Sequence, residues 1–227
     1  MQHHQVVVVG GGTGGLSVAA RLRELDPGLD VALVEPSTKH YYQPIWTLVG
    51  GGVFPKEISE REEADYVPDG VTWIREAVAT FEPEEHALTT AAGTRVGYDQ
   101  LVVAAGIQLD WDKIRGLEGH LGQDGIVSNY LYSTVESTWS ALKAMESGNA
   151  VFTFPSTPIK CAGAPQKIMY LADEELRRRG VRERCNVIYA AASPGLFGVE
   201  RYARPLREIV DRPGIVTQFQ RNLVEVR

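Results

Sequence analysis

A glycine-rich turn near the N-terminus constrains the fold of this chain most strongly. Before it, Val6–Val9 is a continuous run of β-branched residues, which is typical of a parallel strand buried on both faces. After it, Leu16–Leu25 has the apolar spacing of a helix that ends before Pro27. A strand, a tight glycine turn and a helix in this order predict the opening βαβ unit of a dinucleotide-binding domain.

The turn contains the pattern G-x-G-x-x-G at Gly10, Gly12 and Gly15. Gly10 permits the tight turn, Gly12 lets the backbone approach a pyrophosphate, and Gly15 lets the helix pack closely on the strand. A glycine turn without a ligand is the alternative interpretation. The flanking strand and helix are the context that the fingerprint requires, so they favour a dinucleotide site.

The helix start and the next strand supply the remaining groups of this site. Thr13 and Gly14 lie at the predicted helix N-terminus, where free N–H groups and the positive end of the helix dipole attract phosphates. Val31–Val34 is the expected second strand, and Glu35 follows it about 20 residues after the last glycine of the pattern. We expect the Glu35 carboxylate to accept hydrogen bonds from ribose hydroxyls and to repel a 2′-phosphate.

Two later segments favour FAD over NAD as the dinucleotide. Val78 begins a predicted strand whose backbone would face the adenine. Tyr98–Gly106 has an aromatic-Asp pair and an apolar run that closes on Ala105 and Gly106. This run resembles the second signature of flavoproteins with two dinucleotide-binding domains, which simple NAD dehydrogenases lack.

Strand and helix patterns alternate along the whole chain, which predicts an α/β fold with two Rossmann-like, doubly wound domains. We expect residues 1–120 to form the first part of an FAD-binding domain. Residues 121–227 are expected to form a second Rossmann-like domain that lacks a nicotinamide fingerprint and is truncated at the C-terminus. Between them, residues 36–69 predict a long and mostly irregular stretch, and Val216–Val226 predicts a final pair of strands.

Charge and composition exclude several classes of protein. The net charge is −6 and no basic patch is present, so nucleic acid is not an expected partner. No apolar run approaches the roughly 18–20 residues of a membrane-spanning helix. Two cysteines are too few for a secreted disulfide scaffold, which favours an intracellular protein. The scattered histidines and carboxylates show no metal-ligand spacing.

The second half lacks what a nicotinamide site needs. The turn after the predicted strand Ala150–Phe154 is Pro155–Pro165, in which proline rings remove N–H donors and the glycine spacing is absent. The following strand ends in Ala190–Ala192. It has neither an acidic residue that could bind ribose hydroxyls nor a basic residue that could bind a phosphate. We therefore expect no bound NAD(P) in this half.

Cys161 in this loop is the candidate nucleophile. It lies just before a helix that Pro165 can start, and Lys160 is its neighbour. A helix N-terminus and nearby cations favour the reactive thiolate form of a cysteine. A free cysteine is more often inert and buried, and that interpretation is preferred for Cys185, at the start of a core strand.

Several long segments resemble the sulfide:quinone oxidoreductases, in the branch that includes the mitochondrial enzyme. The resemblance covers essentially the whole chain and is carried by His40–Gly50, Ala105–Asp110, Thr157–Leu171 and Phe197–Val199. It implies oxidation of sulfide with two electrons passed through FAD to a membrane quinone. It also implies a cysteine pair that takes up the sulfur as a persulfide and gives it to a small thiol or to sulfite.

The resemblance assigns roles to individual residues. Cys161 matches the flavin-facing cysteine of the pair, and Gln43 joins the FAD contacts Thr13, Gly14, Glu35 and Val78. His40, Tyr41, Tyr42 and Trp46 either pack beside the flavin ring or simply pack their own loop.

The family is nearly twice as long as this chain. Its remaining part holds the partner cysteine, which Cys185 does not match, and the helices that contact membrane and quinone. The resemblance therefore implies an N-terminal portion of such an enzyme, peripheral on the inner face of a membrane when complete. Two alternatives remain open: an NAD(P)H:quinone dehydrogenase-like flavoprotein, and a catalytically incomplete FAD-binding module.

Overall fold

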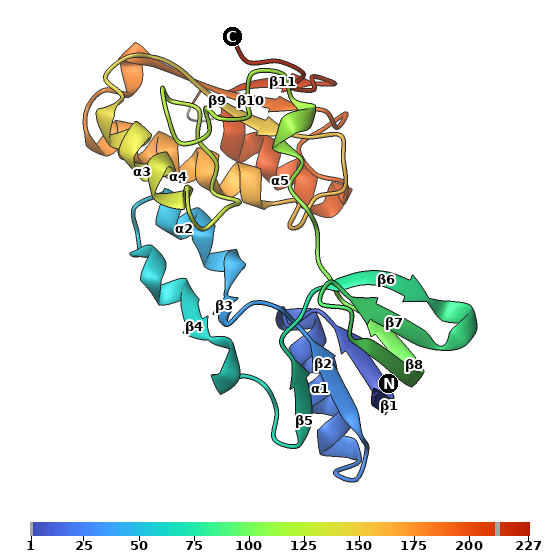
Figure 1. Cartoon of the computed structure of the whole chain (residues 1–227). Coiled ribbons are helices and arrows are strands. Elements are labelled where there is room, and N and C mark those ends of the chain that lie inside the picture. The colour runs from blue at the N-terminus through green and yellow to red at the C-terminus, as the bar shows by residue number, and fades with distance from the viewer. Residues whose placement is uncertain (1, 212–213) are drawn as a thin grey trace. The chain divides into compact units, whose positions relative to one another are not determined.

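The computed structural model describes residues 2–211 and 214–227. It divides into two compact units, which Figure 1 shows with their elements labelled. The first unit comprises Met1–Tyr42 and Ser59–Gln108, and the second comprises Gln43–Ile58 and Leu109–Arg227. The division into domains at residue 120 stays a prediction.

The first unit is built on a six-stranded sheet in the order β5-β2-β1-β8-β7-β6. The first four strands of this order run parallel, while β7 is antiparallel to both β8 and β6. The strands are β1 (Gln2–Val9), β2 (Val31–Val34), β5 (Val71–Ile74), β6 (Val78–Glu82), β7 (Ala87–Thr90) and β8 (Arg95–Val103).

Along Val6–Val9 both faces of β1 are buried, which explains why this part of its sequence is continuously apolar rather than alternating. Val6 and Val8 pack with Leu16 and Ala19 of helix α1 (Thr13–Leu25) on one face. Val7 and Val9 face the opposite side and pack in a second cluster, which includes Leu88 and Val96. Parallel strands covered on both faces read as unbroken apolar runs, as the sequence predicted here.

The segment between β2 and β5 contains short elements that sequence periodicity did not reveal. Strand β3 (Lys39–Tyr41) pairs antiparallel with β4 (Glu60–Glu62), although the two strands have no alternating apolar pattern. Between them lies helix α2 (Trp46–Gly50), which belongs to the second unit. The chain therefore leaves the first unit at Tyr42 and returns to it at Ser59.

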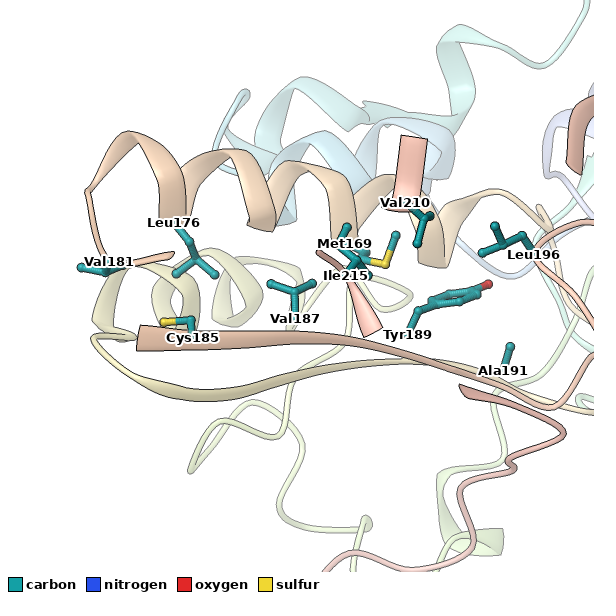
Figure 2. Packing of buried hydrophobic residues seen from close by; sticks show 10 residues of the cluster. All are labelled: Met169, Leu176, Val181, Cys185, Val187, Tyr189, Ala191, Leu196, Val210 and Ile215. Atoms are coloured by element: carbon teal, nitrogen blue, oxygen red, sulfur yellow. The ribbon is translucent and has the colours of Figure 1, made fainter. Parts of the chain in front are cut away.

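The second unit contains a three-stranded parallel sheet in the order β11-β10-β9. In Figure 2, alternate side chains of β10 point toward helix α4 and form one buried cluster with it. Helix α2 packs against α3 and α4 within this unit. Its elements are α3 (Val135–Ala144), β9 (Gly148–Phe154), α4 (Ala164–Arg178), β10 (Cys185–Ala191), α5 (Glu200–Asp211) and β11 (Val216–Phe219).

The predicted pair of strands over Val216–Val226 is wrong, because a single strand, β11, forms there. Gln220 has a left-handed backbone with φ of 56° directly after β11, and this turn ends the strand. Farther on, the Arg221 N–H donates to the Ala191 carbonyl at 2.9 Å, and the Val226 N–H donates to the Arg115 carbonyl at 2.9 Å in an isolated bridge.

None of the helices within residues 2–211 and 214–227 combines the length and the apolar character that crossing a bilayer requires.

Candidate functional site

The glycine turn joins β1 to α1 in the geometry that the fingerprint predicts. Gly10 has φ of +102°, and a Cβ there would lie 2.4 Å from the Ala104 carbonyl oxygen. A Cβ on Gly15 would lie 1.8 Å from the Gly10 carbonyl oxygen. Backbone therefore approaches backbone at both positions, and neither tolerates a side chain.

The outer side of this turn is open and rich in backbone donors. A Cβ on Gly12 would meet no atom within 4 Å, and helix α1 begins after Gly12 without a side-chain cap. Thr13 and Gly14 form the first residues of that helix. Uncapped N–H groups beside open space fit an anionic pyrophosphate, which the helix dipole also favours.

Glu35 lies directly after β2 and is already bound to this turn. Its Oε2 accepts a hydrogen bond from the Gly11 N–H at 2.7 Å, and its Oε1 accepts one from the Ser37 N–H at 2.7 Å. Each carboxylate oxygen has a second lone pair, so Glu35 can still accept a ribose hydroxyl. The indole of Trp73 donates to the Glu35 carbonyl at 2.9 Å and fixes the backbone below it.

The other predicted contacts of the first unit fall on two segments. Ala105 and Gly106 directly follow β8. This segment lies against the glycine turn, since a Cβ built on Gly10 would be 3.1 Å from the Cα of Ala105. Val78 is the first residue of β6, at the edge of the sheet, where a register shift interrupts its pairing with β7.

Sequence reasoning missed a buried carboxyl group next to the turn. Glu63 is 1% exposed, and a Cβ on Gly11 would lie 2.3 Å from its Oε1. His40 links the two, because its Nδ1 lies 3.3 Å from the Glu63 Oε2 and 3.3 Å from the Gly11 carbonyl oxygen. No periodic pattern marks these residues, and only the resemblance drew attention to His40.

Gln43 and the aromatic residues after it belong to the second unit. Gln43 starts a single turn of 3₁₀ helix that leads into α2. Trp46 is 4% exposed, and its ring lies 6.1 Å from that of Tyr132. Trp46 is therefore buried among side chains of its own unit, whereas Tyr42, in the first unit, is exposed.

The loop between β9 and α4 presents Cys161 to solvent. Cys161 is exposed and has a left-handed backbone with φ of 68°. Its carbonyl accepts a hydrogen bond from the Ala164 N–H at 3.1 Å, so the loop turns directly into α4. Pro165 stands in the first turn of that helix, as its sequence position indicated.

Two neighbours shape the surroundings of this cysteine. The hydroxyl of Tyr130 donates to the Lys160 carbonyl at 3.0 Å. Burial raises the pKa of Tyr130 to about 12, and the charges of Cys161 and Tyr189 act in the same direction. Burial lowers the pKa of Lys160, and the charge of Cys161 opposes that shift. Tyr130 therefore remains a protonated donor beside the loop.

Cys185 takes no part in this loop. It is the first residue of β10, is 2% exposed, and packs in the cluster of Figure 2 with Leu176, Val181 and Val187. Within the part of the chain that the structure describes, no group of three or more His, Cys, Asp and Glu side chains is arranged to hold a metal ion.

Comparisons with known proteins place this geometry in a family. Residues 4–146, more than half of the chain, match the family described as pyridine nucleotide-disulphide oxidoreductase. The mitochondrial sulfide:quinone oxidoreductase of Dictyostelium discoideum is 44% identical over 98% of this chain and 50% of that protein. The mitochondrial enzyme of Mus musculus is 46% identical over 99% of the chain and 50% of that protein.

A solved structure extends the likeness to the fold. The sulfide:quinone oxidoreductase of Aquifex aeolicus superposes with a TM-score of 0.84 at 22% identity, covering all of this chain and 53% of that one. The chain thus spans about half the length of the relatives it matches. It belongs to the pyridine nucleotide-disulphide oxidoreductase family, and sulfide:quinone oxidoreductases are its homologues.

Proposed function

We propose that this chain binds FAD through its first unit and presents Cys161 as the sulfur-binding thiolate of a sulfide:quinone oxidoreductase. The observation that carries the proposal is the loop between β9 and α4. A glycine turn would fill this place in a nicotinamide-binding domain, whereas here the loop exposes a cysteine at the start of a helix. The homology to sulfide:quinone oxidoreductases over nearly the whole chain supports it.

The residues of the first unit fit the dinucleotide part of FAD. The open space at Gly12 and the uncapped start of α1 suit a pyrophosphate, and Glu35 suits a ribose with free hydroxyls. We assign Gly10, Gly12, Thr13, Gly14 and Gly15 to the phosphates. We also assign Val78, Ala105 and Gly106 to FAD, and Gln43 on the strength of the resemblance alone.

The proposed chemistry joins the sulfur of sulfide to Cys161 as a persulfide. Forming this S–S bond from hydrogen sulfide anion and a thiolate releases one proton and two electrons. FAD, when bound, would supply the two-electron acceptor for this oxidation, and a quinone would be the final acceptor. The persulfide sulfur then passes to a small thiol or to sulfite. Cys161 is the nucleophile that holds the sulfur, and Tyr130 is a protonated donor that keeps its loop in place.

The chain has two cysteines, and Cys185 is buried in the core, so this chain supplies only one of the two redox cysteines that such a cycle uses. The complete cycle, with an intracellular enzyme peripheral on the inner face of a membrane where quinone is dissolved, therefore remains part of the proposal.

The test loads the purified chain with FAD and adds sulfide without oxygen while flavin absorbance is followed. We expect a change in the flavin spectrum and one added sulfur on Cys161 by mass spectrometry. Cys161→Ser should abolish both signals, while the matched variant Cys185→Ser, at the buried cysteine, should keep them if it folds. Spectral changes that survive Cys161→Ser would overturn the assignment of this residue.

The alternative of an NAD(P)H:quinone dehydrogenase predicts a nicotinamide site in the second unit. The structure offers no acid or base at the end of β10, which finishes at Ala191, and proline residues interrupt the loop after β9. An incomplete FAD-binding module without sulfide chemistry is the other alternative. It predicts a yellow protein whose flavin does not respond to sulfide.

A further inference from the structure

The carboxyl group of Glu63 is buried beside the glycine turn, with an unusual shortage of partners. Its residue is 1% exposed, and within the described residues its Oε1 has no hydrogen-bond partner. Its backbone N–H donates to the Thr38 carbonyl at 2.9 Å, which fixes the position of the residue. A buried polar atom that is left unpaired costs stability.

His40 connects Glu63 to the backbone of the turn. Its Nδ1 lies 3.3 Å from both the Glu63 Oε2 and the Gly11 carbonyl oxygen, and its ring stacks on Tyr66 with centroids 5.2 Å apart. A carbonyl oxygen can only accept a hydrogen bond, so Nδ1 must carry the proton. One imidazole N–H is thus shared between the peptide of the turn and the buried carboxyl.

This contact fixes the direction of the next amide. The Gly11 carbonyl and the Gly12 N–H belong to one planar trans peptide, in which the two groups point to opposite sides. Anchoring the carbonyl on His40 therefore turns the Gly12 N–H away from His40. Gly12 is the residue with open space around it, where a phosphate can approach. On the other side of Gly11, its own N–H is held by Glu35 at 2.7 Å.

We propose that His40, backed by Glu63, is a positioning residue that sets the Gly11–Gly12 peptide to donate its N–H to the pyrophosphate of an adenine dinucleotide. The inference rests on the dinucleotide-binding part of the proposed function and is independent of the sulfide chemistry. The contacts that carry it all lie within the first unit.

The charges around Glu63 predict how this device responds to pH. Burial raises the pKa of Glu63, His40 acts against that shift, and Glu35 adds to it. When Glu63 ionises, its carboxylate competes more strongly for the shared His40 proton and adds negative charge near the pyrophosphate. Dinucleotide affinity should then fall as pH rises. Of the other charged groups of the β3–β4 hairpin, Lys39 pairs with Glu60 and Glu62, and Arg61 is exposed and donates to the Glu60 carbonyl.

The experiment titrates FAD and ADP separately into the purified chain. ADP carries the pyrophosphate and ribose without a flavin, so its binding reports on the turn alone. His40→Phe keeps an aromatic ring for Tyr66 but has no N–H, and we expect binding of both ligands to weaken about tenfold. His40→Asn, which can still donate, should recover most of that loss. The matched control is His3→Phe, at an exposed histidine of β1, and it should bind like the wild type.

Glu63→Gln tests the second half of the pair, because an amide of the same shape cannot ionise. The terminal phosphate of ADP titrates equally in both proteins, so the ratio of the Glu63→Gln affinity to the wild-type affinity should rise with pH. The matched control Glu62→Gln, at the exposed residue directly before it, should keep the wild-type profile. Equal ADP affinity of His40→Phe and His3→Phe, or a wild-type pH profile in Glu63→Gln, would overturn the proposal.

Two results separate this inference from the proposed function. If the wild type binds ADP and the His40 and Glu63 variants bind it equally well, only the role of His40 is contradicted. If the wild type binds neither ADP nor FAD, both proposals are contradicted. Nitrogen NMR of the wild-type histidines offers a check that needs no variant to fold. The protonated nitrogen of His40 should be Nδ1, and finding the proton on Nε2 alone would contradict the geometry.

Discussion

At the scale of single residues, the ionisation of Glu63 should be visible in the stability of the protein. Burial raises its pKa above the ordinary 4.5, His40 opposes the shift and Glu35 adds to it. A carboxyl whose pKa is raised binds more protons in the folded than in the unfolded chain. The free energy of unfolding therefore falls as pH rises from the ordinary value through the raised one.

Glu63→Gln removes this slope, since the amide does not titrate. Relative to the wild type, its free energy of unfolding should improve with rising pH, by about 1.4 kcal/mol for each unit by which the pKa is raised. Urea unfolding at about pH 5 and about pH 8 measures the difference. Curves that stay parallel over this range would mean that Glu63 does not change its protonation there, while Glu62→Gln should match the wild type throughout.

The left-handed backbone at Cys161 carries a stability cost of its own. Its φ of 68° disfavours any residue with a Cβ by about 1–2 kcal/mol, and only glycine is free of that cost. Cys161→Gly should therefore raise the free energy of unfolding by about 1 kcal/mol, while Cys161→Val should lower it because a β-branched side chain fits there worst. Thermal unfolding of the two variants beside Cys161→Ala is the measurement. A glycine variant less stable than the alanine variant contradicts this backbone geometry.

Tyr130 restrains the same loop through its hydroxyl. Tyr130→Phe removes the hydrogen bond to the Lys160 carbonyl and should cost about 0.5–1.5 kcal/mol of stability. The loosened loop should also let iodoacetamide alkylate Cys161 faster. The control is Tyr202→Phe, at an exposed tyrosine of α5, which should change neither quantity. Identical alkylation rates in both variants would show that the hydroxyl does not restrain the cysteine.

At the scale of elements, two glycines of one turn should fail in different ways. A Cβ on Gly15 meets the Gly10 carbonyl oxygen at 1.8 Å, and backbone cannot move aside as a side chain can. Gly15→Ala should destabilise the fold by about 3 kcal/mol. Gly12 has φ of −69° and open space, so Gly12→Ala should fold normally yet bind FAD and ADP more weakly. Denaturant unfolding and ligand titration separate the two effects, and a Gly12→Ala variant with full affinity would place the pyrophosphate elsewhere.

The elements that the sequence predicted well are those with a local signal. Val31–Val34 is a strand with the expected bounds, because a buried parallel strand is an unbroken apolar run. The pairing of β3 with β4 could not be foreseen. Apolar and polar side chains do not alternate along these two strands. The strands are also separated in the sequence by Gln43–Ile58, which belongs to the second unit. The end of β11 was also missed, since nothing in the residue type of Gln220 announces a left-handed turn.

At the scale of the whole molecule, some residues of the candidate site belong to local sequence motifs, whereas others come together only when the chain folds. The glycine turn, Glu35 and the Cys161 loop could be predicted from the sequence because each is a compact motif next to a predicted strand. Glu63 and His40 were not assigned any role at the turn, because they reach Gly11 only when the β3–β4 hairpin folds. Homology identifies the family, whereas the hydrogen bonds that hold the turn are known from the structure.

The central claim is that the second unit serves sulfur chemistry where related folds bind a nicotinamide. The most direct measurement offers the FAD-loaded chain two electron donors in turn, without oxygen, and records the flavin spectrum after each. The account predicts that NADH leaves the flavin oxidised, whereas sulfide changes its spectrum in the wild type and not in Cys161→Ser. Rapid flavin reduction by NADH, with no response to sulfide, would contradict it.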